Sequence, residues 1–401
     1  MLKFMTLARL SGNPRVTIRR AGSPDPEGAA VVYWMQRAQR AWDNPALDVA
    51  ISAANLLDKP LVVFFGLFPF VARANLRHYT FLAEGLRDIA SGLRRRRVGF
   101  VLRVYPQHRL EPFLDEVRPS LVIGDENPLR QMEGWRTTMA ERLRVPLWTV
   151  DADVVVPTAI LEKEQYAART IRPRIHEHLP AFLARTPQPD VRIQWKGRVT
   201  GERVAAAAAI LDGLPIDRSI GAVATFRGGT SAARTALRRF TAAGLADYDV
   251  DRNHPERAGT SRLSPYLHFG HLGPREVARH VIRSGAPEAS IAAFIEQLIV
   301  RRELAVNFVH FNDAYDRLDG CEAWARRTLR RHSFDRRAHL YDRDTLEGAA
   351  TADPLWNAAQ RELTTTGWMH NYVRMYWGKK ILEWSRTPQE AFDTAVVLND
   401  R

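Results

Sequence analysis

Strand-like segments are confined to the first 150 residues of this 401-residue chain, and this asymmetry constrains the fold more than any other feature. Three short runs rich in β-branched and aromatic residues are typical of buried parallel strands. They are residues 60–65, 98–104 and 121–123. Helix-like stretches, such as 72–93 and 110–117, alternate with them. This alternation predicts a doubly wound α/β domain built on a parallel sheet.

A ligand of such a domain is expected at the carboxyl ends of the strands, where the connecting loops diverge around a crevice. In this chain the candidate positions are Phe65 and Gly66 after one strand, and residues 124–126 after another. The sequence therefore predicts a binding site at one edge of the sheet.

The second half of the chain carries a different pattern, because strand signals disappear after residue 230 and helical spacing continues to the end. The expected helices are 231–245, 273–284, 291–311, 354–365, 368–384 and 387–398. Residues 1–27 are polar and turn-rich and are expected to form a loose lead-in. The predicted organisation is an α/β domain at 28–155, a connector at 156–229 and an all-α domain at 230–401.

The charge balance points to a polyanionic partner. The net charge of +13 favours nucleic acid, although arginine-rich usage that reflects genome composition is the alternative. No apolar run approaches the roughly 20 residues that a membrane helix needs, and no secretion signal is recognisable. A single cysteine, Cys321, cannot form an intramolecular disulfide, which is typical of a reducing cytoplasm.

The segment 259–266, Gly-Thr-Ser-Arg-Leu-Ser-Pro-Tyr, has the composition of an anion-binding loop. Ser264 followed by Pro265 predicts a helix N-cap with proline in the first helical position. Thr260 and Ser261 would then offer hydroxyls beside the free N–H groups of a helix start, which is an arrangement that binds phosphate. A well-capped surface helix without a ligand is the alternative.

A second candidate is the segment 296–303, Glu-Gln-Leu-Ile-Val-Arg-Arg-Glu. In an α-helix, Glu296, Val300 and Glu303 would share one face, with Arg301 and Arg302 beside it. Glu296 follows an apolar stretch, so its carboxyl group is expected to have a raised pKa or a specific hydrogen-bond partner. A lattice of salt bridges that holds neighbouring helices together is the alternative.

Three tryptophans, Trp356, Trp377 and Trp384, stand among helix formers in the last fifty residues. Trp377 and Trp384 are seven residues apart and therefore lie on one helical stripe. Indoles this close together would permit electron hopping, whereas a plain core stripe is the alternative.

The same helical segment carries Asn371, Arg374 and Met375 on one face, a polar pair with a soft apolar neighbour. A metal site is not expected anywhere in the chain. The twelve histidines include no pair with ligand spacing, and His176 and His178 are only two residues apart.

Taken together, five ordered stretches resemble the photolyase and cryptochrome flavoprotein family, and most closely the class II cyclobutane pyrimidine dimer (deoxyribodipyrimidine) photolyases. The stretches are 32–35, 259–270, 300–304, 353–360 and 375–384. The resemblance runs from about residue 31 to the last residue. It implies an FAD held in the helical domain and an antenna chromophore, of deazaflavin or folate type, in the α/β domain.

The resemblance also implies individual site residues. The positions that match cofactor-binding residues are Tyr248, Thr260, Ser261, Leu263, Ser264, Arg301, Asn371, Arg374 and Asn399. Glu296 and Met375 match residues that touch the pyrimidine dimer, and Asn399 matches a residue that faces the flavin. Trp377, nearer the flavin, and Trp356, further out, match the photoreduction chain, while Trp384 is either a branch of that chain or a core residue.

The implied function is light-driven repair of cyclobutane pyrimidine dimers by a monomeric, cytoplasmic enzyme that binds UV-damaged DNA. Family members continue beyond the position that matches Arg401, so the chain is expected to be short at its C-terminus. A cryptochrome-like photoreceptor without repair activity and an inactive remnant are the alternatives.

Overall fold

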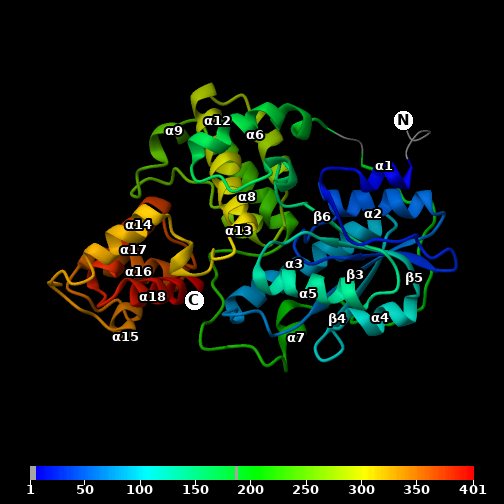
Figure 1. The fold of residues 1–401 in the computed structure, drawn as a ribbon, viewed down its shortest axis with the longest axis horizontal. Coiled ribbons are helices and arrows are strands. Elements are labelled where there is room, and N and C mark those ends of the chain that lie inside the picture. Colours follow the sequence, from blue (N-terminus) through cyan, green and yellow to red (C-terminus); the bar gives the residue numbers. More distant parts are fainter. Residues whose placement is uncertain (1–5, 186–187) are drawn as a thin grey trace.

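The computed structural model describes residues 6–185 and 188–401, and its first part is an α/β body built on one six-stranded sheet (Figure 1). The strands lie in the order β1-β6-β5-β2-β3-β4. Their bounds are β1 Val16–Arg20, β2 Ala30–Trp34, β3 Leu61–Leu67, β4 Gly99–Val104, β5 Pro119–Asp125 and β6 Leu147–Val150. Every neighbouring pair is parallel except β1 with β6. The predicted doubly wound fold is confirmed.

Helices cover both faces of this sheet, as the alternating side chains of its strands require. Helices α2 (Pro45–Leu56) and α3 (Leu76–Arg95) pack with one set of strand side chains, and α4 (Leu110–Val117) and α5 (Arg130–Arg142) with the other. In β2, for example, Val31 belongs to the first apolar cluster. The next residue in the chain belongs to the second cluster, because successive strand residues point to opposite faces.

The expected loose lead-in was wrong for the part of it that the structure describes. The chain forms α1 (Leu7–Ser11) and then β1, whose Val16 pairs with Val150 of β6. This strand escaped recognition because it lies at the sheet edge and has no apolar face, with Ile18 51% exposed. Its neighbour Arg15 is buried and donates to the carbonyl oxygens of residues 151 and 154 at 2.9 and 3.0 Å.

The rest of the chain is helical, as predicted, and forms a central body and a C-terminal lobe (Figure 1). The central helices are α6 Ala168–Leu183, α7 Ala207–Leu211, α8 Thr230–Ala243, α9 Tyr248–Asp251, α10 Ser264–His268, α11 Pro274–Ile282, α12 Glu288–Ile295 and α13 Arg302–Phe311. The lobe contains α14 Ala323–Arg331, α15 Arg343–Glu347, α16 Pro354–Thr366, α17 Asn371–Trp384 and α18 Pro388–Asp400. No helix in the described ranges is both long and apolar enough to cross a bilayer.

Two features of the helical part differ from the expected pattern. Helix α6 lies in the segment expected to be a connector, yet its Ile171 and Ile175 are fully buried in the core of the central body. Pro173 and Pro180 inside the helix hide its periodicity. The expected helix 291–311 is interrupted by a π-helix at Glu296–Arg301, between α12 and α13.

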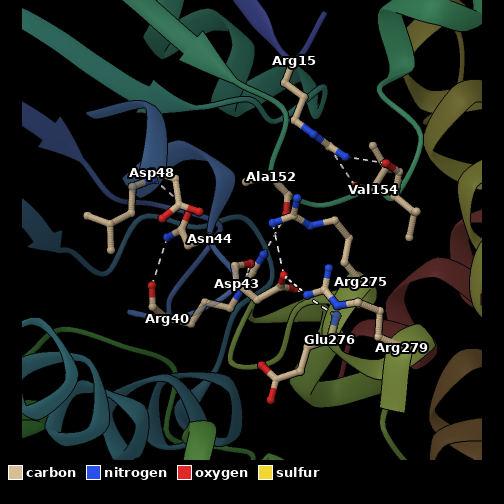
Figure 2. Close-up of polar contacts among 12 residues, drawn as sticks. Arg15, Arg40, Asp43, Asn44, Asp48, Ala152, Val154, Arg275, Glu276 and Arg279 are labelled. Carbon is tan, nitrogen blue, oxygen red and sulfur yellow. Dashed lines mark hydrogen bonds and ion pairs between the residues drawn. The ribbon is translucent and has the colours of Figure 1, made fainter. Parts of the chain in front are cut away.

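A buried polar network joins the α/β body to α11 (Figure 2). The carboxylate of Asp43 accepts a hydrogen bond from the N–H of Glu276 at 3.0 Å and pairs with Arg279 at 2.6 Å and Arg275 at 3.1 Å. Next to it, Arg40 donates to the carbonyl oxygens of residues 152 and 270 at 2.8 and 3.1 Å. These contacts fix the position of the helical body relative to the sheet.

Candidate functional site

The anion-binding loop lies at the edge of a cleft of about 870 Å³ between α3, α8 and residues 258–262. Thr260, Ser261 and Arg262 line the cleft. Within the described ranges, the backbone N–H groups of Thr260 and Ser261 have no hydrogen-bond acceptor. A Cβ at Gly259 would lie 2.5 Å from the Cβ of Asp251, so glycine lets this loop approach α9 closely.

The charged groups that line this cleft are mostly basic. The basic groups are Arg87, Arg227, Arg239 and Arg262, and the acidic groups are Glu84 and Asp88. Both carboxylates already accept hydrogen bonds from backbone N–H groups, at 2.6 Å from Gly228 and 2.7 Å from Ser231. The cleft therefore offers free hydroxyls, N–H groups and guanidinium groups, which together suit phosphate oxygens.

The predicted cap of helix α10 was wrong by one residue. The helix begins at Ser264 with Leu263 as its N-cap, and no side chain caps it. Leu263 already has near-helical backbone angles, which leaves Ser264 exposed inside the first turn. Leu263 and Tyr248 belong to the core, where Tyr248 packs edge-on against Phe294 at 5.2 Å.

The loop at 259–266 contacts the segment that precedes α17 through Trp368. The guanidinium of Arg262 lies over the Trp368 ring at 4.4 Å, and Arg262 has a left-handed φ of 52°. On α17, Arg374 donates a hydrogen bond to Oδ1 of Asn399 in α18. Burial lowers the pKa of Arg374, and Asn371 is exposed at the start of the helix. The structure thus pairs Arg374 with Asn399, outside the lining of the cleft.

Glu296 has a specific hydrogen-bond partner, which was one of the two predicted alternatives. Arg172 of α6 donates to both of its carboxylate oxygens, at 3.0 Å from Nε and 2.8 Å from Nη2. Arg301 adds a third bond of 3.2 Å. The hydrogen bonds from Arg172 hold the pKa of Glu296 below its usual range, so the other alternative, a raised pKa, was wrong.

The prediction that Glu296, Val300 and Glu303 share one helical face was also wrong, because the π-helix changes the angular spacing of these residues. In a π-helix residues five apart are neighbours, which brings Arg301 to Glu296. Glu303 is buried instead, and accepts hydrogen bonds from the N–H groups of Val155 and Val156 at 2.6 and 3.2 Å. Burial raises the pKa of Glu303 to about 8.

The three tryptophans lie together in the core of the C-terminal lobe. The rings of Trp356 and Trp377 are parallel within 1°, with centroids 6.3 Å apart. Trp384 meets Trp356 at 5.5 Å and 70°. Both indole N–H groups of the parallel pair are satisfied, by the carbonyl oxygen of residue 377 and by Oε1 of Gln360. The two interpretations of this cluster, a path for electrons and a plain core stripe, are compatible. The stacked rings are buried in the core and also lie close together.

Met375 lies on the exposed side of the same helix, with 52% of its surface accessible. Among the described residues, Glu296 is hydrogen-bonded to Arg172 and Arg301 and not to Met375. Both side chains remain accessible from outside the protein, Glu296 with 22% of its side chain exposed.

The α/β body contains a second cavity, of about 500 Å³, at the carboxyl ends of the strands. Phe65 and Gly66, one of the two positions predicted for a ligand, line it. Residues 124–126 do not line it, because Asp125 accepts three backbone N–H bonds from residues 36–38 and Glu126 binds Arg19. The carboxylates at 125 and 126 hold loops together, and the crevice is lined by apolar and aromatic groups together with polar ones such as Arg37 and Asn127.

Arg172 is a residue of this site that was not predicted from the sequence. It is 124 positions away from Glu296 and lies in the segment that was expected to be a connector. No local pattern identifies such a partner, since the pairing depends on how α6 packs against the π-helix.

The sequence profile of the DNA photolyase family matches residues 31–190. The chain is 42% identical over 385 residues to the deoxyribodipyrimidine photo-lyase of Methanothermobacter thermautotrophicus, which covers 94% of this chain and 83% of that protein. The chain belongs to the DNA photolyase family.

Solved structures share the fold at lower sequence identity. A bacterial class III photolyase from Agrobacterium tumefaciens is similar with a TM-score of 0.66 and 19% identity over 95% of this chain and 80% of the other. An archaeal photolyase from Sulfolobus tokodaii, determined with two FAD molecules, has a TM-score of 0.62 and 16% identity over 92% and 81%. These likenesses concern the arrangement of the α/β body and the helical part.

Proposed function

We propose that this protein is a light-driven lyase that repairs cyclobutane pyrimidine dimers in DNA with bound FAD. The observation that carries the proposal is the contact between Trp356 and Trp377 on α16 and α17, in a chain 42% identical to a deoxyribodipyrimidine photo-lyase. A stack of buried indoles offers a path for electrons toward the polar face of α17. When bound, reduced FAD supplies the photoexcited electron that splits the cyclobutane ring and takes it back afterwards.

The donor groups of the cleft fit the phosphates of such a cofactor. Thr260 and Ser261 present N–H groups that have no acceptor in the part of the chain that the structure describes, and Arg262 lies beside them. Asn371 and Arg374 are proposed to lie along the flavin ring and Asn399 to face it, and the hydrogen bond between Arg374 and Asn399 orients both of these side chains. Tyr248 and Leu263 support the loop from the core, and Ser264 and Arg301 complete the proposed set.

The chain's own groups would act on the dimer through binding and charge. A flipped dimer leaves the base stack at a cost of roughly a few kcal/mol, less at a damaged site. The ionised carboxylate of Glu296 would accept hydrogen bonds from pyrimidine N–H groups, and Met375 would pack against the dimer from the exposed side of α17. Preorganised groups of this kind are effective because they need no rearrangement during the reaction.

The decisive experiment is an absorption spectrum of the purified protein followed by a repair assay. An oxidised-flavin band that bleaches under blue light with a thiol, together with light-dependent loss of dimers from an oligonucleotide, is the expected result. A preparation that binds and photoreduces FAD but repairs nothing would favour a photoreceptor. A colourless protein that cannot be reconstituted with FAD would refute the proposal.

Replacement of Arg172 by glutamine should shift the acidic limit of repair to higher pH. Glu296 has a pKa below its usual value, so its ionised form is present above that pKa and is lost as the pH falls through it. Removal of Arg172 removes the largest cause of the depression, and the carboxylate becomes protonated at a higher pH.

The measurement is the repair rate of chemically reduced protein between about pH 3.5 and 7, a range that includes the usual glutamate pKa of about 4.3. Arg301→Gln is the matched control, because it removes the same charge but only one hydrogen bond. We expect a smaller shift in that variant. Superimposable pH profiles for the wild type and Arg172→Gln would contradict the assignment.

We further propose that the cavity of the α/β body holds an antenna chromophore of deazaflavin or folate type. Aromatic side chains at Trp34, Phe65 and Trp135 line a crevice suited to a planar ring system. Met132→Trp should fill part of this cavity and abolish the antenna contribution to the action spectrum, while direct excitation of FAD still drives repair. An unchanged action spectrum in protein loaded with the chromophore would refute the location.

A further inference from the structure

The segment 323–343, which comprises α14 and the loop up to the start of α15, is unusually basic and has no role in the proposed chemistry. It contains seven arginines: Arg326, Arg327, Arg330, Arg331, Arg336, Arg337 and Arg343. Its two carboxylates are Asp335 and Asp342, so seven minus two leaves a net charge of +5 in 21 residues. That is over a third of the net charge of the whole chain.

None of these seven arginines forms an ion pair with any residue in the described ranges. Asp335 is occupied by a 2.8 Å contact with His332. Elsewhere, arginines such as Arg172 and Arg279 bind carboxylates directly. The exposed guanidinium groups of this segment are therefore available to a ligand outside the protein. They belong to Arg327, Arg330, Arg331, Arg336 and Arg343.

Large aromatic groups are interleaved with these charges. Trp324 of α14 is 65% exposed and Phe334 in the following loop is 97% exposed, and no residue of α14 is buried. Exposed aromatic side chains among unpaired arginines are typical of surfaces that bind nucleic acid, where they pack on sugars and bases beside the phosphates. Helix α14 belongs to the C-terminal lobe, which also carries the exposed Met375 (Figure 1).

We propose that residues 323–343 form a DNA-binding surface that contacts the phosphate backbone of the duplex next to the dimer. This inference rests on the proposed function, in that it takes DNA as the substrate. The guanidinium fork matches two phosphate oxygens at once, and Trp324 packs against the adjoining sugars and base edges. An anionic membrane is the less suitable partner, because α14 has only nine residues and its single tryptophan provides no continuous apolar face.

The test uses the triple variant Arg327→Gln, Arg330→Gln, Arg331→Gln in the full chain, with undamaged duplex DNA in the dark. Each lost phosphate contact reduces the slope of log K against log salt concentration by about 0.9, so the slope should fall by up to about 2.7. The control is Arg94→Gln, Arg95→Gln, Arg97→Gln at the end of α3, which removes the same charge from another exposed arginine run. The control should change the slope much less.

Trp324→Ala supplies a second readout. It should weaken binding roughly five-fold or more while leaving the salt slope unchanged, because base and sugar packing releases no counterions. Equal slopes for the two triple variants would overturn the proposal, and so would a test variant that loses binding to anionic vesicles but keeps binding to DNA. A wild-type protein that binds DNA with the expected slope but repairs no dimers would refute the proposed function and leave this surface standing.

Discussion

Replacement of Trp377 by phenylalanine should slow photoreduction of the bound flavin at least about 100-fold, equivalent to a barrier higher by about 2.7 kcal/mol. Trp377 is buried and its ring is parallel to that of Trp356 at a centroid distance of 6.3 Å. A phenyl ring is much harder to oxidise than an indole, so the variant retains an aromatic group in the core but interrupts the path for electrons. Trp356→Phe should act in the same direction.

The measurement is the bleaching of the flavin band under blue light with a thiol reductant. Trp148→Phe is the control, because Trp148 is equally buried but lies in β6 of the α/β body. Protein reduced chemically beforehand should repair dimers at the wild-type rate even with phenylalanine at 377. If the Trp377 variant photoreduces as fast as the Trp148 variant, the stack serves only the core of the lobe.

Replacement of Asp43 by alanine should lower the free energy of unfolding by about 3–5 kcal/mol, the cost of breaking a buried ion pair on one side. The carboxylate is 8% exposed and faces Arg275 and Arg279, with 11% and 20% exposed side chains (Figure 2). Without the Asp43 carboxylate, the guanidinium groups of Arg275 and Arg279 and the N–H of Glu276 each lose an acceptor, at a site that is largely closed to water.

Urea unfolding followed by tryptophan fluorescence measures this effect. Asp316→Ala is the matched control, since Asp316 pairs with Arg130 at 2.8 Å but both side chains are well exposed. An exposed pair contributes no more than about 1 kcal/mol. Equal losses for the two variants would mean that the network between the sheet and α11 does not hold the two bodies together.

Much of the fold could be predicted because its signals are local. The runs at 60–65 and 98–104 became β3 and β4, because short continuous apolar runs are typical of buried parallel strands. Residues 110–117 became α4, because their apolar side chains have helical spacing. The edge strand β1 and the proline-containing helix α6 were missed for the same reason. One has no apolar face and the other has an interrupted one, so both are stabilised by contacts with distant segments.

The candidate site likewise has parts that local sequence could predict and parts that depend on distant segments. The loop at 259–266, the tryptophans and the polar face of α17 could be identified from residue types and spacing, and the crevice beside Phe65 from the direction of the strands. The π-helix could not, because no local pattern marks it and the helices that pack against it, α6 and α11, come from distant parts of the chain. It places Arg301 beside Glu296, where an α-helix would place Val300.

The sequence by itself determined the α/β character of the first part of the chain and the helical character of the last part, the basic character of the chain and the motifs that place it among photolyases. Only the tertiary structure decided the ionisation of the two glutamates. Glu296 is kept charged by Arg172 from a distant helix, whereas burial raises the pKa of Glu303 to about 8. The physical reason is that periodicity depends on neighbours in the chain, while a carboxyl group responds to burial and to charges within a few ångströms, which distant segments supply.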